Sequence, residues 1–423
     1  MIKYIKFSLI ISSGLFFGRL LGFIREIIIA NKFGISELTD KIILILTGPD
    51  LINNIVSVSA ISLILIPYFE ENKNRFDIKY IMKKLVYKFF ILSLISYLVT
   101  SLIFVFIYEN DILILLIISL ISIFPNILSG IFVSWLQFKE KFFLPSFTTF
   151  IFNFFIVISL LFYIDLRIFS ITVVIASFFR FIFIYFPSFN NFKSELNKKK
   201  FYLNKSLENL SYKKILIIFL SYGLIYTIPV IDKIFASKLQ DGELSLISFA
   251  EKVYFLPCVI LLSTFSIAIF PKFTKLTVEK KFNELKILFN KSLFVIFVGS
   301  ITVLLVIIVF GEHIIGLIYY FSDFNEITIK TIYDILINFS GVILFYGFLS
   351  LIISIMFSSK LFNEIFIISL FGISIKVLLN SMVILNNGTS MDLALNSSIV
   401  FLIISFLLYL TFTIKLNKKI SNN

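Results

Sequence analysis

The sequence has few of the residues that build disulfide, metal and redox sites. Its 423 residues include one cysteine and one histidine. A single cysteine excludes a disulfide scaffold, and Cys258 with His313 supplies too few ligands for a structural zinc site. We therefore expect no metal site, no catalytic residues and no bound cofactor.

Charge is scarce as well. Charged residues make up 15% of the chain and hydrophobic residues 59%, and the mean hydropathy is +1.02. Soluble globular proteins average about 25% charged and about 45–50% apolar residues. The combination excludes an ordinary water-soluble enzyme, and the high apolar content excludes a disordered chain. The G-x-x-x-x-G-K-[ST] motif of nucleotide-driven proteins is also absent from the sequence.

Long apolar runs dominate what remains. A helix of about 20 apolar residues crosses a bilayer, so the sequence predicts an all-α, polytopic membrane protein with about twelve transmembrane helices. The first run is not a cleaved signal, because it is too long and contains Arg19 and Arg25. The expected spans are about 8–31, 42–69, 86–107, 112–136, 144–164, 167–187, 214–237, 247–270, 289–310, 331–357, 362–386 and 392–414.

The basic residues fall mainly on one side of these spans. The chain has 38 Lys and Arg against 25 Asp and Glu, and most of the basic residues lie in alternate loops. Cytoplasmic loops carry the excess of Lys and Arg in membrane proteins, so we expect both termini in the cytoplasm. The net charge of +13 then requires no nucleic-acid partner. The most basic loops are 70–88, 188–214 and 272–291.

The two halves of the chain repeat each other. Residues 62–96 and 265–299 each read as apolar span, proline, basic amphipathic linker and apolar span. A repeat holding six spans begins on the same side each time, so the halves are parallel repeats, and such repeats place the substrate path near mid-membrane. We expect a central cavity that works by alternating access. The predicted domains are an N-terminal six-helix bundle over 1–190, a basic linker over 191–213 and a C-terminal six-helix bundle over 214–423.

Several charges lie inside predicted spans, where each costs at least a few kcal/mol unless it faces a cavity or a partner. Arg19 and Arg25 are six residues apart, so their side chains diverge by about 120° and can border a wide cavity. Arg binds phosphate through a two-pronged fork and Lys as a point charge. A cationic cavity for a phosphate-bearing lipid headgroup is therefore one interpretation.

Internal ion pairing is the alternative. On this interpretation Arg25 pairs with Glu26 of another layer, Lys376 with Asp232, and Lys252 with Asp50. Lys233 and Arg180 are expected to extend their charged ends towards the membrane surface.

The segment GRLLGFIREIIIANKFGISELTD (18–40) resembles the opening of the MurJ/MviN family, the lipid II flippases of the multidrug/oligosaccharidyl-lipid/polysaccharide exporter superfamily. The resemblance continues through 49–71, 236–257 and 311–324, and it covers essentially the whole chain. It implies movement of an undecaprenyl-diphosphate-linked saccharide from the inner to the outer leaflet.

The resemblance also implies site residues. Two first-span arginines and the acid after that span match residues of the family, and a lysine stands where the family has an eighth-span arginine. Where the family carries an arginine pair in the second span, this chain has two asparagines, and it has twelve expected spans where typical members have fourteen. By this resemblance the substrate-binding residues are Arg19, Arg25, Asp40, Asn53, Asn54 and Lys252.

Some members of that family use a sodium site that includes a seventh-span acid. Asp232 is the matching residue, and Lys376 and Asn380 lie four residues apart on one face of the eleventh span. These three are the candidates for a coupling-ion site, in which the Lys376 ammonium would replace the ion. The membrane potential alone favours outward movement of two negative charges by about 4–5 kcal/mol per 100 mV, and coupling to Na+ or H+ stays open.

Two other transport functions stay open. One is a flippase for an O-antigen or capsule unit, and the other is a multidrug exporter of the same superfamily, whose cavity would be net acidic. A membrane glycosyltransferase would need large external loops with acidic or histidine chemistry, so an enzyme is not expected. We expect a monomer in the bacterial cytoplasmic membrane whose partners are the glycan lipid, membrane lipid and cell-envelope biosynthesis enzymes.

Overall fold

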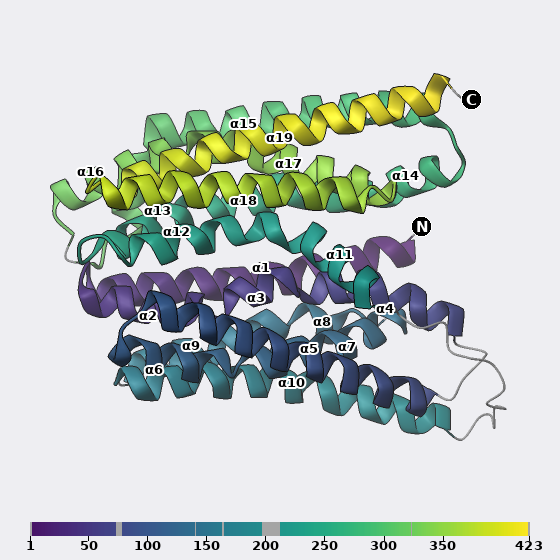
Figure 1. Ribbon diagram of the computed structural model, residues 1–423, viewed down its shortest axis with the longest axis horizontal. Coiled ribbons are helices and arrows are strands. Elements are labelled where there is room, and N and C mark those ends of the chain that lie inside the picture. Colours follow the sequence, from purple (N-terminus) through teal and green to yellow (C-terminus); the bar gives the residue numbers. More distant parts are fainter. Residues whose placement is uncertain are drawn as a thin grey trace. The chain divides into compact units, whose positions relative to one another are not determined.

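The computed structural model describes residues 2–72, 78–139, 141–162, 165–196, 212–322 and 324–421. All regular elements in these ranges are helices (Figure 1). Nine helical stretches within the described ranges are long and apolar enough to cross a membrane. The predicted all-α, polytopic fold is therefore confirmed. Residues 197–211, most of the predicted basic linker, lie outside the described residues.

Nine of the twelve predicted spans coincide with these stretches, and the other three also fall on helices. The first predicted span lies in α1 (Ile2–Phe33). The fifth is divided between α8 (Phe143–Ser146) and α9 (Thr148–Phe162). The eighth is divided among three consecutive helical elements, described below.

The chain forms two compact units. The first contains Met1–Ile29 and Lys41–Gly223, and the second contains Ala30–Asp40 and Leu224–Asn423. The stretch 30–40 thus belongs with the C-terminal half. The remaining helices of the first unit are α3 (Asp50–Ile55), α4 (Val58–Asn72), α5 (Ile78–Ile107), α6 (Asn110–Leu120), α7 (Ile123–Phe138), α10 (Leu166–Leu196) and α11 (Tyr212–Gly223), and α2 (Glu37–Thr47) begins in the second unit and ends in the first.

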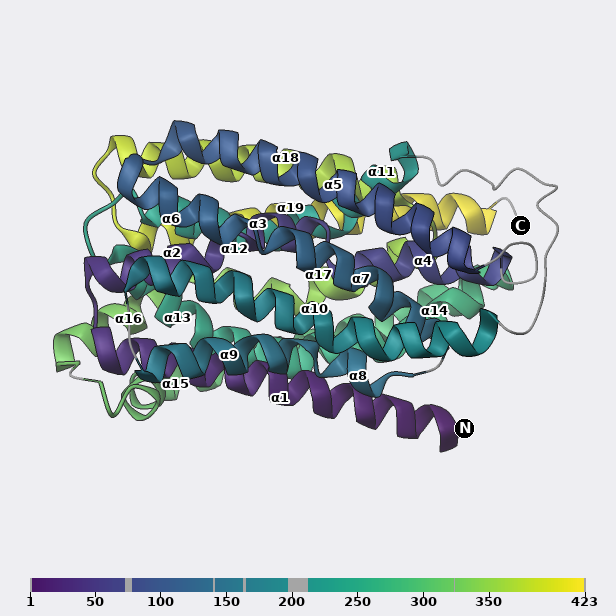
Figure 2. The same ribbon diagram turned by 90° about the horizontal axis from the view of Figure 1, so that it is seen from below.

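Helix α1 lies beside α8 and α9 in the first unit (Figure 2). Glycines allow this approach: a Cβ on Gly18 would lie 3.0 Å from the Thr149 side chain, and one on Gly22 would lie 3.1 Å from Asn153 Nδ2. Small residues at such contacts are the usual means of close helix packing in membranes. This packing fixes the rotation of α1 against α8 and α9, and therefore the direction in which its basic residues point.

The second predicted span is broken rather than continuous. Helix α2 ends at Thr47, and Pro49 precedes α3, which runs only to Ile55 before α4 begins at Val58. Proline lacks the N–H that would continue the helical ladder, which accounts for the first break. The polar pair Asn53 and Asn54 therefore lies on a short helix between two interruptions.

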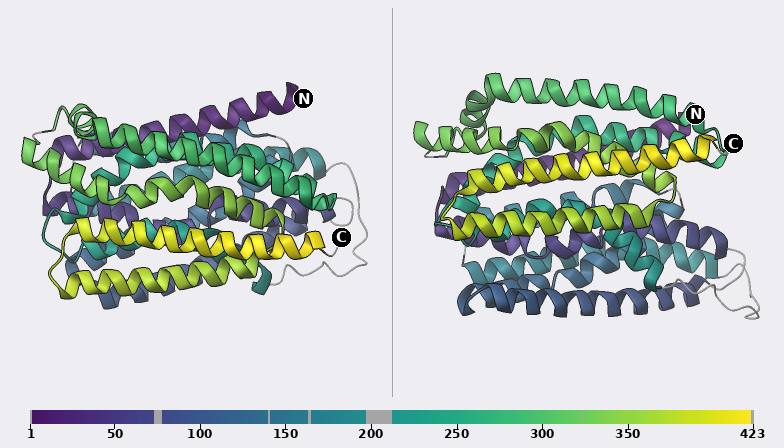
Figure 3. Two further views of the ribbon diagram at one scale, coloured as in Figure 1. Left: turned by 90° about the horizontal axis from the view of Figure 1, so that it is seen from above. Right: turned by 45° about the horizontal axis from the view of Figure 1, so that its top comes forward.

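The second unit is built around α17 (Ser340–Ser358), which packs against α14 (Thr264–Val278), α15 (Phe282–Ile318) and α19 (Ser390–Ser421). Helices α18 (Phe362–Leu385) and α19 run side by side (Figure 3). The other elements are a 3₁₀ turn η1 (Leu224–Thr227), α12 (Ile228–Ala236), α13 (Glu243–Pro257), a π-helical segment η2 (Cys258–Ser263), α14 (Thr264–Val278), α15 (Phe282–Ile318), α16 (Glu326–Asn338), α18 (Phe362–Leu385) and α19 (Ser390–Ser421).

The repeat found in the sequence is visible in the helix boundaries. Helix α13 begins 206 residues after α2, and α14 begins 206 residues after α4. Helices α4 and α14 are each 15 residues long. Both copies are interrupted directly before that helix, by the break at Val56 and Ser57 in the first copy and by the π-helical segment η2 in the second. The two halves thus share a broken helix at the same place.

Candidate functional site

Arg25 is held between its sequence neighbour and a second helix. Its Nη2 lies 2.7 Å from Oε1 of Glu26, and its Nη1 donates a hydrogen bond of 3.1 Å to Oδ1 of Asn153 on α9. Asn153 Nδ2 in turn donates to the carbonyl oxygen of Gly18 at 3.0 Å. Asn153 therefore links α9 to α1 and sets the direction of the Arg25 guanidinium.

The Arg25 guanidinium is largely buried. Its side chain is 14% exposed, against 5% for Glu26, and its Nε has no hydrogen-bond partner among the described residues. The predicted alternative of an ion pair between Arg25 and a glutamate is therefore present. An anionic ligand would have to compete with Glu26 for the fork. Arg19 lies on the same helix and is half-buried.

Asp40 has a structural role. Its carboxylate accepts hydrogen bonds from the backbone N–H of Gly242 at 2.7 Å and of Ser245 at 2.8 Å, and from the Ser245 hydroxyl. Gly242 has φ +92°, a left-handed value that suits glycine. Asp40 thus caps α13 from a distant part of the sequence, where a negative charge also suits the helix dipole. Sequence reasoning predicted substrate binding for this residue.

Asn53 and Asn54 are both half-buried on α3. Asn53 Oδ1 is buried and accepts no hydrogen bond from the described residues. Lys252 is half-buried on α13, and its ammonium lies 5.9 Å from the ring centroid of Phe255. That distance permits a cation–π attraction.

The three predicted coupling-ion residues come together in the second unit. Lys376 Nζ lies 2.5 Å from Asp232 Oδ1 and donates to the Leu393 carbonyl oxygen at 2.9 Å. Asn380 Nδ2 donates to Asp232 Oδ1 at 3.0 Å, and the Ser397 hydroxyl donates to Oδ2. Lys376 and Asn380 have no exposed surface, and Asp232 is 2% exposed.

This arrangement does not fit a bound sodium ion. A carboxylate and a backbone carbonyl are the oxygen ligands that a hard cation prefers, but the Lys376 ammonium already contacts both. In the described parts of the chain, no group of three His, Cys, Asp or Glu could hold a metal ion. The lysine supplies the positive charge that such a site would need.

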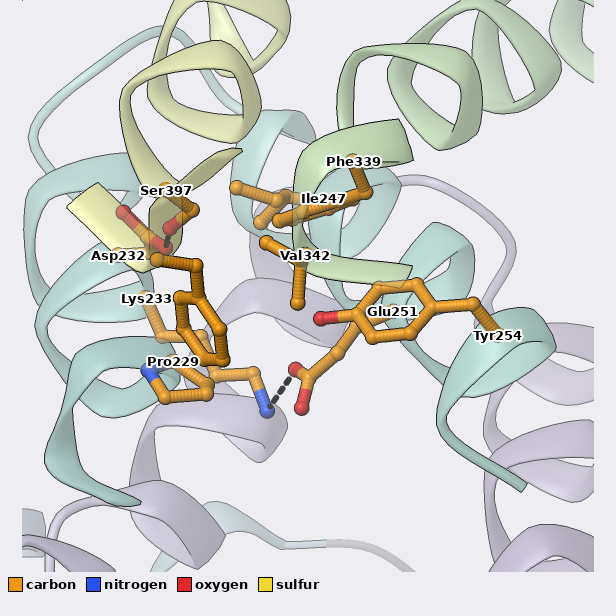
Figure 4. A pocket seen from close by; sticks show the side chains of 10 residues that line it. Pro229, Asp232, Lys233, Ile247, Glu251, Tyr254, Phe339, Val342 and Ser397 are labelled. Atoms are coloured by element: carbon orange, nitrogen blue, oxygen red, sulfur yellow. Dashed lines mark hydrogen bonds and ion pairs between the residues drawn. The ribbon is translucent and has the colours of Figure 1, made fainter. Parts of the chain in front are cut away.

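A second buried ion pair was missed by sequence reasoning. Lys233, predicted to extend towards the membrane surface, is buried and lies 2.7 Å from Glu251 on α13. The only sequence signal is an adjacent acid and base on each helix, Asp232-Lys233 and Glu251-Lys252. This pattern does not show which acid pairs with which base. Figure 4 shows the pair at the edge of a small cavity. The cavity is lined by Pro229, Asp232, Lys233, Ile247, Glu251, Tyr254, Phe339, Val342, Ser397 and Phe401.

Comparison with known sequences identifies the family. The profile described as lipid II flippase MurJ matches residues 29–422. The probable lipid II flippase MurJ of Buchnera aphidicola subsp. Schizaphis graminum is 26% identical over 416 residues, covering 92% of this chain and 80% of that protein. The probable lipid II flippase MurJ of Borreliella burgdorferi is 26% identical over 365 residues, covering 82% and 71%.

Solved structures share the fold. A lipid II flippase MurJ in an inward closed conformation matches with a TM-score of 0.74 and 23% identity, over 96% of this chain and 87% of that one. A MATE protein in complex with MaL6 matches with a TM-score of 0.67 and 12% identity, over 98% and 97%. At these identities the likeness concerns the fold alone. Together with the profile match over nearly the full chain, it shows that this multi-pass membrane protein belongs to the MurJ family of lipid II flippases.

Proposed function

We propose that the protein moves lipid II, the undecaprenyl-diphosphate-linked precursor of peptidoglycan, from the inner to the outer leaflet of the bacterial cytoplasmic membrane. The family match over residues 29–422 carries this proposal. An O-antigen or capsule lipid is not favoured, because the curated relatives are lipid II flippases. Multidrug export is not favoured either, because the likeness to MATE proteins extends to the fold alone.

The diphosphate of the lipid binds the Arg25 guanidinium by displacing Glu26. Bidentate Arg–phosphate contacts are among the stronger hydrogen bonds in proteins, and Asn153 keeps one edge of the fork in place. The half-buried Arg19 offers a second cation on the same helix. The half-buried amides of Asn53 and Asn54 supply neutral hydrogen-bonding groups.

The energy for transport comes from the membrane. With both termini in the cytoplasm, moving the two negative charges of a diphosphate outward gains about 4–5 kcal/mol per 100 mV. The Lys376 ammonium takes the position of a coupling cation beside Asp232 and Asn380, so no step of the cycle depends on sodium. The protein acts as a monomer and receives its lipid from cell-envelope biosynthesis enzymes.

The test is the leaflet accessibility of labelled lipid II in cells depleted of their own flippase. Arg25→Ala is expected to lower the flipping rate by about 10- to 100-fold, since a charged hydrogen-bonding partner contributes about 1.5–3 kcal/mol. The matched control is Arg167→Ala, which removes an exposed arginine at the start of α10. Wild-type flipping by Arg25→Ala would refute the proposed role of this residue.

A further inference from the structure

The first unit contains an arginine, Arg180, that the proposed transport mechanism does not use. It lies 14 residues after the start and 8 residues before the end of the apolar stretch Leu166–Ser188, so it is about 12 Å from the nearer end. Its side chain is half-buried, and it makes no hydrogen bond and no ion pair with the described residues. A cation at this depth usually faces a partner or a water-filled cavity, so Arg180 is available to a ligand.

An acid lies close enough to act on this arginine. Asp50 follows Pro49 at the first break in the second span, and its charge attracts the Arg180 guanidinium. Asp50 lies 13 residues after the start and 16 residues before the end of the apolar stretch Glu37–Ile66, yet its side chain is exposed. A carboxylate about 20 Å from the nearer end of this stretch is too costly to place in lipid, so its exposed side borders water.

Two amide oxygens near these charges have no hydrogen-bond partner among the described residues. They are Oδ1 of Asn53, which is one turn after Asp50 on α3, and Oδ1 of Asn126, whose residue is only 8% exposed. Helix α7, which carries Asn126, contacts both α3 and α10. Asn126 is four residues before Gly130, the glycine against which Ile61 of α4 packs, so it lies on the side of α7 that faces α3 and α4. Unpaired buried amides of this kind can accept hydrogen bonds from a ligand.

The spacing of these groups suits an extended ligand better than a single small ion. The rings of Phe132 on α7 and Phe181 on α10 have centroids 5.8 Å apart, and Arg180 is next to Phe181 in the sequence. Asn126 lies six residues before Phe132, which is about 9 Å along the helix. An extended peptide covers about 3.3 Å per residue, so about three peptide residues reach from the guanidinium to this amide.

The group therefore combines one acid, one guanidinium and neutral amides. A simple anion would be repelled by Asp50 and a simple cation by Arg180, whereas a ligand with both charges is attracted to both residues. We propose that this site binds the zwitterionic peptide part of the transported lipid, with a peptide ammonium at Asp50 and a peptide carboxylate at Arg180. The amide oxygens of Asn53 and Asn126 accept hydrogen bonds from peptide N–H groups. This inference rests on the proposed function, because lipid II carries a peptide with a free amine and free carboxylates.

Equilibrium binding tests the site by changing the charges of the ligand and the protein in turn. Calorimetric titrations of the full-length protein in lipid nanodiscs compare three short-chain forms of lipid II: unmodified, acetylated at the peptide amine, and amidated at the peptide carboxylates. The wild type should bind the unmodified form about tenfold more tightly than either modified form, because each modification removes a hydrogen bond between charged groups. Asp50→Asn should lose the preference over the acetylated form, and Arg180→Gln the preference over the amidated form.

Matched controls separate the effect of charge from those of size and folding. A dimethylated peptide amine keeps its positive charge, so this form should bind as tightly as the unmodified one. Asp111→Asn removes another exposed aspartate of the first unit, and Arg167→Gln removes an exposed arginine on α10, so both variants should keep both preferences. Because the Asp50 side chain is exposed, Asp50→Asn carries the test even if Arg180→Gln fails to fold.

Equal binding of the unmodified and acetylated forms by the wild type overturns the peptide site and leaves the proposed function standing. A preference that persists unchanged in Asp50→Asn also overturns the site, because the peptide amine is then recognised elsewhere. If the wild type neither binds nor flips any form of lipid II, the proposed function is refuted and this inference with it.

Discussion

In the first unit the acid that pairs with Arg25 is its neighbour in the sequence, whereas in the second unit each buried cation finds its acid on another helix. The Arg25–Glu26 pair lies within α1 and does not join two helices, and the contact of Arg25 with α9 is a hydrogen bond to the neutral side chain of Asn153. The cross-helix pairs of Lys233 and Lys376 join α12 to α13 and to α18. The difference teaches that the ion pairs of similar intramembrane charges join separate helices in the second unit, whereas the pair of Arg25 lies within one helix.

The largest effect is expected from breaking the ion pair between Lys376 and Asp232, which is the most buried of the pairs compared above. Lys376→Met leaves Asp232 as an uncompensated buried charge, which costs about 3–5 kcal/mol of folding free energy. The measurement is thermal unfolding of the detergent-purified protein. The neutral double variant Asp232→Asn/Lys376→Met should recover most of the loss, and a single variant as stable as the wild type would contradict the helix-association role.

An intermediate effect is expected at Asn153 in the first unit. Asn153→Ala removes the hydrogen bonds to Arg25 and to the Gly18 carbonyl oxygen, and a net loss of about 1.5 kcal/mol corresponds to roughly tenfold slower flipping. The matched control, Thr172→Ala, removes a hydroxyl that bonds only locally, to Ile168 O on α10. If the flipping rates of both variants equal the wild-type rate, Asn153 does not position the guanidinium.

The smallest effect is expected from an exposed pair in the turn between α14 and α15. Lys281 Nζ lies 3.0 Å from Glu279, and this hydrogen bond lowers the pKa of Glu279 below its ordinary value. A lowered pKa stabilises the folded state above the unfolded-state pKa, and this contribution is lost as the pH falls through the folded-state pKa. Glu279→Gln should therefore leave flipping unchanged. It should lower the thermal stability at most slightly, and only at pH values above the folded-state pKa of Glu279. A loss comparable to that of Lys376→Met would remove the contrast between exposed and buried pairs.

The sequence alone predicts the helices well, because apolar runs report directly on contact with lipid. The repeat follows from the same pattern, and α13 and α14 begin where the first copy places them. The ion pair of Lys376 with Asp232 is one of the two interpretations that the sequence supports, because both charges must be satisfied somewhere in the bilayer.

Other contacts depend on packing that hydropathy does not encode. Helices α12 and α13 each carry an adjacent acid and base, and only the rotation of the two helices decides whether Lys233 meets Glu251 or Asp232 meets Lys252. Asn153 reads as one polar residue in an aromatic run, and its bond to Arg25 requires the close approach at Gly22. A family resemblance could match Asp40 to an acid but not show that it caps a helix about 200 residues away.

The assignment of residues 30–40 to the second unit has a consequence for how the polypeptide can be divided. A fragment ending at Gly223 would carry the aspartate that the start of α13 requires, and the complementary fragment would lack it. Two halves made from separate genes would therefore not be equivalent. The C-terminal fragment would complete its fold only after the N-terminal fragment had supplied residues 30–40. Assembly would therefore have an obligatory order.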